Sequence, residues 1–434
     1  MQHISLAVVS MLPRTTIIIA LSLSSHHSVT VTTAAAAAAA AMTMSTTTSP
    51  SSSNTANGIV ARRAAIAQLR STSDKHANLI NVAKCAGWAK RHGAQMLFLP
   101  ECFGFMGESA EQTLKEADPP ILSNNAAEFE DDNVGSWCPA TTLFREILSQ
   151  TIANAAGGDG DGDDQDGDQL SVEIMSAFSA SSSLPTISII DELRFIACKS
   201  KLWISGGGVH TKATMPQATT STTATTTNPV DENKVYNTHV IINDRGQIQA
   251  HYHKIHLFDV SIPGKVELRE SSTTSPGTKL VVCDSPIGKL GLSICYDMRF
   301  AEMYVEMVQK RGAQVLLMPS AFTVPTGKAH WHALLKARAI ENQCYVIAAA
   351  QVGRHNEKRQ SYGHSLVYDP WGDSPADAGG NDGAGSHGTV AGKTCNSPVY
   401  APSLIIADID LNKVEKVRQS MPMQIHRNEF RFSD

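Results

Sequence analysis

Apolar and polar positions follow two spacings along this chain, one typical of helices and one typical of strands. Residues 64–69 form an apolar run, residues 74–92 show helical periodicity with Ser73 as the expected N-cap, and residues 96–100 form a second apolar run. Further runs of the kind found in strands lie at residues 202–205, 238–243, 248–253, 289–294, 315–318, 345–349, 364–368 and 404–408. Strands with helices between them predict an α/β fold in which helices cover sheets.

Residues 1–58 differ in composition from the rest and are expected to form a low-complexity leader outside the fold. They are rich in Ser, Thr and Ala, and the first acidic residue of the chain is Asp74. This composition is typical of an organellar transit peptide and predicts a mitochondrial location. An equal alternative is an unstructured leader with translation from Met42 or Met44, which predicts a cytoplasmic protein. The apolar stretch 16–23 offers a secretory signal as a competing interpretation, but it is too short to span a bilayer, so we expect no membrane partner.

We expect residues 59–434 to form one domain that three low-complexity insertions interrupt, near residues 153–186, 211–231 and 374–396. Their high content of Gly, Asp, Ser or Thr leaves little apolar surface to bury, so each insertion is expected to be a solvated surface loop.

Two motif-like spacings within these insertions predict no ligand. Asp159, Asp161 and Asp163 are spaced as in a calcium-binding loop, but Asp164 and Leu170 stand where such a loop needs Gly and Glu. The glycines at 383, 385 and 388 have a dinucleotide-binding spacing, but no strand is expected before them and no helix after them.

Charge and cysteine content narrow the possible partners and the compartment. The chain has 36 basic and 41 acidic residues, a net charge of -5, and no block of Lys and Arg that could follow phosphates, so we expect no nucleic-acid partner. The cysteines lie far apart and none forms the paired spacing of a zinc or redox motif. They are therefore expected to be reduced thiols in a reducing compartment.

Three residues with reactive side chains occupy similar places in the pattern. Glu101 follows the apolar run 96–100, and Cys295 follows a short strand in KLGLSICYDMRF, just before a helical segment. Ligands in layered α/β folds collect at the carboxyl ends of strands, and N–H groups after such a Cys can point at an anion. Lys254 lies among apolar and aromatic neighbours in YHKIHLFD. Taken singly, a Glu at a strand end, a buried thiol and a Lys whose head reaches water are ordinary structural features.

Taken together, the strings FLPE, HKIHLFD and GLSICYDMRF resemble, in that order, the Glu, Lys and Cys segments of the nitrilase superfamily of carbon-nitrogen hydrolases. The resemblance covers nearly all of residues 62–432 outside the insertions. It implies a four-layer α-β-β-α sandwich, a homodimer or larger homo-oligomer, and neither a metal nor another cofactor. It also implies that Cys295 is the nucleophile, Glu101 the proton shuttle and Lys254 the group that holds the oxyanion.

The same resemblance implies a second glutamate, for which Glu270 is the best match and Glu267 the nearby alternative. Glu270 would orient Lys254 and the hydrolytic water. Because an amide resists attack, the thiol of Cys295 must lose its proton, and Glu101 can accept it. We expect burial beside a thiolate to raise the pKa of Glu101 toward neutrality.

The residues after Cys295 complete the expected turn. The backbone N–H of Tyr296 is placed to stabilise the oxyanion together with Lys254. Asp297 and Arg299 are expected to form a structural ion pair, although Arg299 can instead contact a substrate carboxylate. Histidines 251, 253, 256, 330 and 332 lack a third ligand at regular spacing, so we expect no metal site.

Residues 320–372 closely resemble the deaminated glutathione amidase branch of the superfamily, particularly at 351–355 and 359–365. This implies a metabolite-repair amidase that cleaves its small 2-oxo amide substrate, deaminated glutathione, into 2-oxoglutarate and cysteinylglycine. The candidate donors for the substrate carboxylate lie in the same polar segment: Arg354, His355, Lys358 and Arg359. For Lys358 the expected role is instead only to solvate the loop.

Two other functions remain open. Ala301 and the PGK sequence at 263–265 favour the omega-amidase branch, which acts on 2-oxoglutaramate. A binding domain without catalytic activity is the other alternative, and the presence of Glu101, Lys254 and Cys295 argues against it.

Overall fold

The computed structural model describes residues 62–121, 139–157, 187–213, 231, 233–262, 266–381, 389–391 and 402–429, all within the compact unit Val60–Asp434. The leader with Met42 and Met44, the PGK sequence, most of the Gly/Asp-rich and Thr-rich runs, and the glycines at 383, 385 and 388 lie outside the described residues. None of the helices in these ranges has the length and apolar character needed to cross a membrane.

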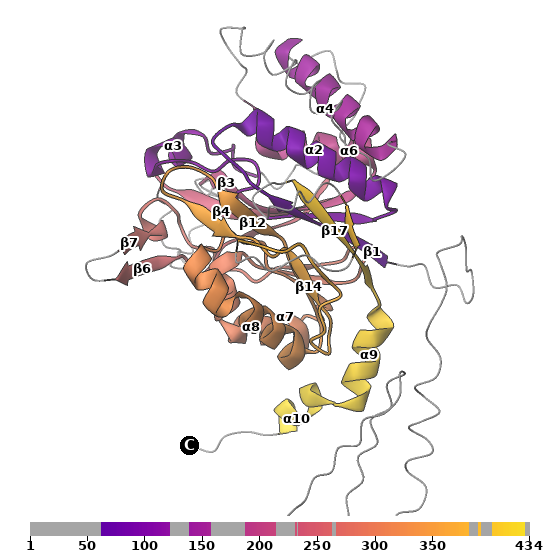
Figure 1. Cartoon of the computed structure of the whole chain (residues 1–434). Helices are drawn as coiled ribbons and strands as arrows, with labels where there is room; N and C mark the ends of the chain where they lie inside the picture. Colours follow the sequence, from indigo (N-terminus) through magenta and orange to yellow (C-terminus); the bar gives the residue numbers. More distant parts are fainter. Residues whose placement is uncertain are drawn as a thin grey trace, which may run out of the picture. The chain divides into compact units, whose positions relative to one another are not determined.

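One inner layer is a nine-stranded sheet (Figure 1). Its main order is β13-β12-β1-β2-β3-β4-β5, and β17 pairs with β1 and with β16. Strands β1, β2 and β3 are parallel, whereas β3, β4 and β5 are antiparallel. The bounds are β1 (Arg62–Leu69), β2 (Met96–Leu99), β3 (Trp203–Lys212), β4 (Val235–Ile242), β5 (Ile248–His253), β12 (Ala350–Arg354), β13 (Gln360–Tyr362), β16 (Thr389–Ala391) and β17 (Ser403–Ile409).

The second inner layer is a six-stranded sheet in the order β15-β14-β11-β10-β9-β8, with β9, β10 and β11 parallel at its centre. The bounds are β8 (Val282–Cys283), β9 (Leu290–Leu292), β10 (Val315–Leu317), β11 (Tyr345–Ala348), β14 (Leu366–Tyr368) and β15 (Ala376–Asp377). A separate ribbon pairs β6 (Asp259–Ile262) with β7 (Val266–Arg269).

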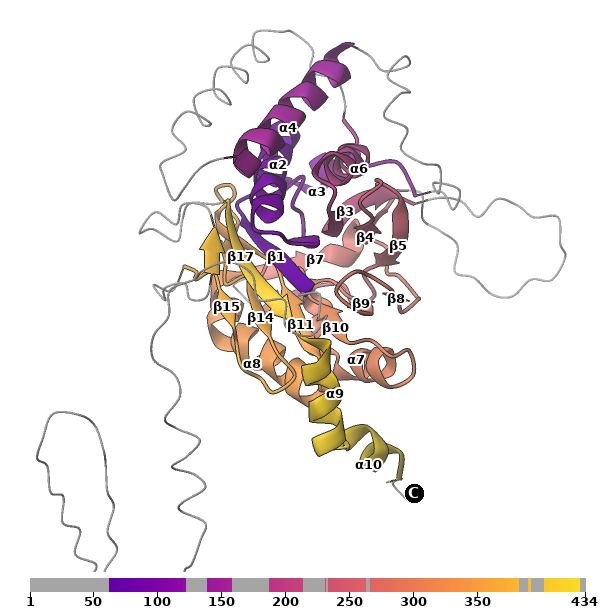
Figure 2. The ribbon, with the colours of Figure 1, turned by 90° about the vertical axis from the view of Figure 1, so that its right-hand side faces the viewer.

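Helices cover the outer face of each sheet (Figures 1 and 2). The nine-stranded sheet packs under α2 (Lys75–Arg91), α4 (Pro139–Gly157) and α6 (Ile189–Ser200), and the six-stranded sheet packs against α7 (Ala301–Gln309) and α8 (Val324–Asn342). Shorter elements are α3 (Ala110–Lys115), α9 (Leu411–Ser420), α10 (Met423–Glu429) and the 3-10 helices η2 (Glu270–Ser272) and η3 (Cys295–Arg299). This layering confirms the expected four-layer α-β-β-α fold.

Strand β1 shows why the inner strands are unbroken apolar runs. Ala64 and Ile66 pack into the core between the two sheets, whereas Ala65, Ala67 and Leu69 pack into the core under the helices. Successive side chains of a strand point to opposite faces, so a strand that is covered on both sides needs apolar residues at every position.

Some expected boundaries are wrong. The first long helix is capped by Asp74, whose side chain accepts a hydrogen bond from the N–H of Ala77 at 3.0 Å, and not by Ser73. Helix α4 continues to Gly157 and β3 to Lys212, so the first two insertions begin later than expected.

The glycine-rich stretch 376–392, expected to be a solvated loop, contains β15 and β16. Its Asp377 is buried and accepts a hydrogen bond from Nδ1 of His364 at 2.9 Å. A polar residue in a low-complexity stretch can therefore be part of the packed fold.

Candidate functional site

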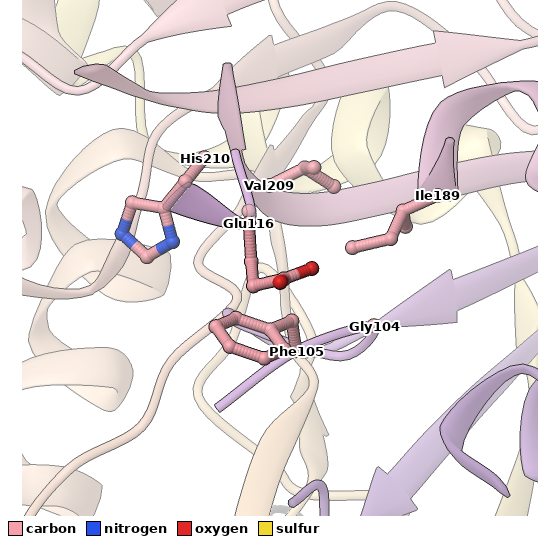
Figure 3. Close-up of a pocket in the computed structure, with 7 residues that line it drawn as sticks. Gly104, Phe105, Glu116, Ile189, Val209 and His210 are labelled. Carbon is pink, nitrogen blue, oxygen red and sulfur yellow. The ribbon is translucent and has the colours of Figure 1, made fainter. Parts of the chain in front are cut away.

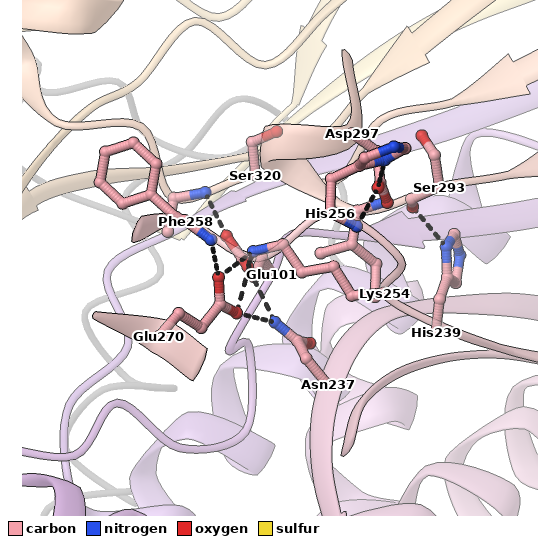
Figure 4. A network of polar contacts seen from close by, with 12 residues as sticks. Glu101, Asn237, His239, Lys254, His256, Phe258, Glu270, Ser293, Asp297 and Ser320 are labelled. Atoms are coloured by element: carbon pink, nitrogen blue, oxygen red, sulfur yellow. Dashed lines mark hydrogen bonds and ion pairs between the residues drawn. The ribbon is translucent and has the colours of Figure 1, made fainter. Parts of the chain in front are cut away.

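Strand β2 delivers Glu101 to the region between the two sheets, directly after Leu99 and Pro100. The side chain is buried, and donors from three other segments bind both of its oxygens (Figure 4). Asn237 Nδ2 and Lys254 Nζ donate to Oε1 at 2.9 and 3.1 Å, and the N–H of Ala321 donates to Oε2 at 3.0 Å. These bonds fix the orientation of the carboxylate.

Two glycines of β3 make room for this turn. A Cβ at Gly207 would lie 2.1 Å from the carbonyl oxygen of Leu99, and one at Gly208 would lie 3.2 Å from Cγ of Glu101. The N–H of Cys102 also donates to the carbonyl of Gly208 at 2.9 Å. Side chains at these two positions would therefore push β3 away from the Glu101 turn.

Lys254 follows β5 and places its ammonium group between two carboxylates (Figure 4). Its Nζ lies 3.1 Å from Glu101 Oε1 and 2.9 Å from Glu270 Oε2. Glu270 is itself held by the N–H of Phe258, which donates to Oε2 at 2.7 Å. Burial acts to lower the pKa of Lys254, but the charges of Glu101 and Glu270 raise it well above its usual value, so the ammonium stays charged.

Cys295 is the first residue of η3, just beyond β9. Its φ of +50° is uncommon for a residue with a side chain, and its N–H donates to the carbonyl of Pro319 at 2.9 Å. The resulting sharp turn presents the half-buried thiol at the end of the strand, where the charge of Glu101 acts on it. The structure thus brings Cys295 together with Glu101, Lys254 and Glu270, which come from segments far apart in the sequence.

The pKa of Glu101 differs from the sequence-based expectation. Burial acts to raise it, but the charge of Lys254, the hydrogen bond from Cys295 and the charge of Arg359 hold it below its usual value. The pKa of Cys295 is instead raised well above its usual value, first by burial and then by the charge of Glu101, with Lys254 opposing. At rest, therefore, Cys295 is a neutral thiol and Glu101 an ionised carboxylate.

Asp297 organises the turn that carries Cys295. It is completely buried, and its Oδ2 accepts hydrogen bonds from the N–H of Ile294 at 2.9 Å and the hydroxyl of Tyr252 at 2.7 Å. Its Oδ1 accepts from the backbone N–H and from Nδ1 of His256 at 3.0 and 2.8 Å. The carboxylate thereby ties η3 to the segment that carries Lys254.

Arg299 does not form the expected ion pair with Asp297. Its guanidinium lies 3.3 Å from Nδ1 of His330 and stacks over the rings of Tyr296 and Phe322, at 5.7 and 5.6 Å from their centroids. The backbone N–H of Tyr296 is in the first turn of η3, where N–H groups have no acceptor within a helix.

Two of the four candidate donors for the substrate carboxylate, His355 and Arg354, have different surroundings. Both ring nitrogens of His355 are within 2.8 Å of protein oxygens, the carbonyl of Ser71 and the hydroxyl of Ser361. Burial lowers the pKa of His355 to about 4, so this buried imidazole is neutral and supports the fold. Arg354 lies exposed at the end of β12. The sequence shows a polar segment here but not which side chains turn inward.

Sequence analysis missed Asn237 and the N–H of Ala321. Asn237 also donates to Glu270 Oε1 at 3.4 Å, so one amide group contacts both carboxylates of the site. Its only sequence signal is a polar residue in a strand that is otherwise mostly apolar. A backbone N–H has no sequence signal at all.

A small pocket opens beside β3, close to the Glu101 turn (Figure 3). Figure 3 shows the Glu116 side chain above the ring of Phe105, with the His210 ring to the left of Glu116. The pocket is lined by Gly104, Phe105, Glu116, Ile189, Gly208, Val209 and His210. Gly208 also packs on Glu101, so the pocket adjoins the candidate site.

Among the described residues, His332, His364 and Asp377 form a group that could hold a metal ion. Nδ1 of His364 already donates a hydrogen bond to Asp377 at 2.9 Å. The group shares no residue with the site at Glu101, Lys254, Glu270 and Cys295.

Comparison with known proteins connects this geometry with a family. The sequence model described as Carbon-nitrogen hydrolase matches residues 179–419, more than half of the chain. A deaminated glutathione amidase from Bos taurus is 36% identical over 364 residues, which cover 84% of this chain and 81% of that protein. The protein of the same name from Dictyostelium discoideum is 44% identical over 240 residues, which cover 55% of this chain and 71% of that protein.

Similar proteins include longer fusions and solved structures. The nitrilase and fragile histidine triad fusion protein NitFhit of Drosophila melanogaster is 36% identical over 364 residues, 84% of this chain, but the match spans just over half (56%) of the length of that relative. The C. elegans NitFhit structure has a TM-score of 0.57 and 34% identity, over 85% of this chain and 65% of that one. The structure of Saccharomyces cerevisiae Nit3, a member of branch 10 of the nitrilase superfamily, has a TM-score of 0.53 and 26% identity, and the match covers 83% of this chain and 94% of that one. This chain therefore belongs to the carbon-nitrogen hydrolase family of the nitrilase superfamily, and it is an enzyme that hydrolyses the carbon-nitrogen bonds of amides.

Proposed function

We propose that the enzyme hydrolyses deaminated glutathione to 2-oxoglutarate and cysteinylglycine through a thioester on Cys295. The observation that carries the mechanism is that the Cys295 thiol, whose pKa the charge of Glu101 raises, shares its site with a Glu101 carboxylate to which Lys254 donates at 3.1 Å. The substrate is supported by the likeness of residues 351–365 to the deaminated glutathione amidase branch and by the printed names of relatives such as the bovine protein.

In the acylation step the sulfur of Cys295 attacks the amide carbonyl carbon while its proton passes to Glu101. The negative oxygen of the tetrahedral intermediate is stabilised by the ammonium of Lys254 and the N–H of Tyr296. When the carbon-nitrogen bond breaks, Glu101 returns the proton to the departing amine, which leaves as the amino group of cysteinylglycine. The acyl group remains on sulfur as a thioester.

Hydrolysis of the thioester uses the same groups. Glu101 accepts a proton from a water that attacks the thioester carbonyl, and the same proton then returns to the sulfur as the acid leaves. Glu270 holds Lys254 through both of its oxygens, at 3.0 and 2.9 Å, so the ammonium keeps its position through both steps. The products are 2-oxoglutarate and an enzyme with its thiol restored.

The deciding experiment measures two reactions of the purified full chain side by side. Cysteinylglycine release from deaminated glutathione is compared with ammonia release from 2-oxoglutaramate, each as kcat/KM, and mass spectrometry of quenched reactions tests for acyl-Cys295. We expect the higher kcat/KM with deaminated glutathione. A higher value with 2-oxoglutaramate would favour the omega-amidase branch, which Ala301 supports, and the lack of any turnover would reject both amidase assignments.

A further inference from the structure

Two basic side chains near the catalytic carboxylates have no role in the steps above, His210 and Arg359. They come from different elements, His210 from β3 and Arg359 from the turn between β12 and β13. Within the described part of the chain, neither side chain has a hydrogen-bond or ion-pair partner. Two free basic groups at one site suggest an acidic ligand.

The sheet register places His210 beside the catalytic carboxylates. His210 lies directly opposite Asn237 in the β3–β4 ladder, and side chains of such a pair lie about 5 Å apart at Cβ. Asn237 hydrogen-bonds to both Glu101 and Glu270. Burial lowers the pKa of His210, which makes it a neutral imidazole with one N–H to donate.

The hairpin that carries Arg359 is fastened to the Glu101 turn. Gln351 of β12 donates through Nε2 to the backbone carbonyl of Glu101 at 3.0 Å. On the other strand, Ser361 pairs with Thr323, two residues beyond the N–H that binds Glu101 Oε2. Arg359 lies two residues before Ser361, so its long side chain starts next to the catalytic turn.

The charge of Arg359 acts on several groups of the site. It contributes to lowering the pKa of Glu101, of the thiol of Cys102 and of His210, which agrees with the attachment of its hairpin to the Glu101 turn. Lys254 with its two carboxylates carries a formal charge of minus one, which would repel an anion. Arg359 brings the local charge to zero.

We propose that Arg359 and His210 bind the 2-oxo acid carboxylate of the substrate, the guanidinium through two hydrogen bonds and the imidazole through one. In the substrates considered above, this carboxylate and the scissile carbonyl stand at the two ends of one five-carbon chain. Holding the carboxylate therefore places the carbonyl against Cys295. The proposal rests on the proposed function in one respect, namely that the substrate is the amide of a 2-oxo dicarboxylic acid.

The test uses 2-oxoglutarate as the probe, because it contains this carboxylate and needs no turnover to be measured. Its Kd is determined by titration calorimetry for the full-length wild type and for Arg359→Gln, Arg359→Lys, His210→Phe and Lys358→Gln. Lys358 is the matched control, because it is an exposed cation next to Arg359, and the causes of the pKa shifts of Glu101 and His210 include Arg359 but not Lys358. We expect Arg359→Gln to raise Kd about 10- to 100-fold and His210→Phe about 3- to 10-fold, with Lys358→Gln within about twofold of wild type.

Arg359→Lys separates a charge contact from a packing role. It should recover part of the lost affinity, since an ammonium keeps the charge but not the planar two-point contact. The kinetic counterpart compares 2-oxoglutaramate with 4-oxopentanamide, in which a methyl group replaces the carboxylate. Arg359→Gln should lower kcat/KM for the acid about 10- to 100-fold, mainly through KM, and for the neutral amide less than about threefold.

The outcomes distinguish this proposal from the proposed function. If 2-oxoglutarate does not bind the wild type, or binds Arg359→Gln equally well in a variant whose melting temperature is unchanged, the carboxylate site is refuted. Should Arg359→Gln fail to fold, the test uses Arg359→Lys. The carboxylate site is refuted if this variant binds 2-oxoglutarate with the Kd of wild type and loses the same fraction of kcat/KM on 2-oxoglutaramate and on 4-oxopentanamide. If 2-oxoglutarate binds as expected while no amide is turned over, the carboxylate site stands and the proposed reaction falls.

Discussion

Two strand ends meet in this site, and they hold their reactive groups in opposite ways. Beyond β2 lies Glu101 and beyond β9 lies Cys295, and each turn contains a residue with positive φ, Cys102 at +58° and Cys295 itself at +50°. Burial opposes ionisation at both places. Even so, the pKa of Glu101 is lowered, whereas that of Cys295 is raised.

The difference lies in the number of donors around each group. Glu101 accepts hydrogen bonds from Asn237, Lys254 and Ala321, whereas the sulfur of Cys295 receives a backbone hydrogen bond from Ala321 and lies next to a negative charge. The site thus keeps its proton on sulfur until a substrate oxygen can take up negative charge beside Lys254. A neutral thiol is also a poor target for oxidation, since the thiolate is the reactive form.

Replacing the thiol of Cys295 should have the largest effect on the rate of hydrolysis. Cys295→Ser leaves a hydroxyl that is far harder to deprotonate than a thiol, so we expect hydrolysis to fall by about 10⁴-fold or more while the fold is kept. The rate of product release and the circular dichroism spectrum measure these two expectations. Cys198→Ser, which changes a thiol on α6, is the control and should keep wild-type turnover. Turnover of Cys295→Ser near that of the control would show that Cys295 is not the nucleophile.

Replacing the Glu101 carboxylate beyond β2 by a neutral amide tests the direction of proton transfer. Glu101→Gln removes the proton acceptor, so kcat should fall about 10³-fold, and Glu111→Gln on α3 should have no effect. The charge of Glu101 contributes to the raised pKa of Cys295, so in Glu101→Gln the thiol should be alkylated by iodoacetamide with a midpoint at lower pH than in wild type. A midpoint that moves to higher pH would contradict the proposed pairing.

The places of Glu101 and Cys295 at two strand ends could be predicted from the sequence. The apolar runs before Glu101 and Cys295 predicted two strand ends, and the carboxyl ends of strands are where α/β folds gather ligands. The pKa of Glu101 was predicted in the wrong direction because burial and the thiolate were considered without the donors from β4, β5 and Ala321. Those donors come from segments that only the folded chain brings together.

The hairpin after β12 shows the same limit. His355 and Arg359 are both basic residues in one polar segment, and the sequence gives no reason to treat them differently. In the structure His355 is fixed by Ser71 and Ser361, whereas the charge of Arg359 reaches the site. Which side chain turns inward depends on backbone register, which composition and spacing do not reveal.

Replacing the cation between the carboxylates should have a smaller effect than losing either reactive group. Lys254→Met should lower kcat about 10²- to 10³-fold with less change in KM, because the oxyanion exists only around the transition state. It should also change the pH profile. Lys254 is the main cause of the lowered pKa of Glu101, so without it Glu101 takes up a proton at higher pH. The acid limb of kcat/KM should therefore move to higher pH, and an acid limb at the wild-type pH would contradict the arrangement.

The smallest effect is expected at Cys102, which separates backbone geometry from chemistry at the Glu101 turn. Cys102 has nearly the same positive φ as Cys295, and its pKa is raised to about 12, chiefly by burial and then by Glu101. Its side chain packs with Met106 and Ala321 instead of reaching the Glu101 carboxylate. Cys102→Ala should therefore reduce the free energy of unfolding by about 1 kcal/mol and leave kcat/KM within about threefold of wild type. Thermal unfolding and steady-state kinetics measure the two values, and a loss of activity near that of Glu101→Gln without unfolding would mean that both thiols take part in the reaction.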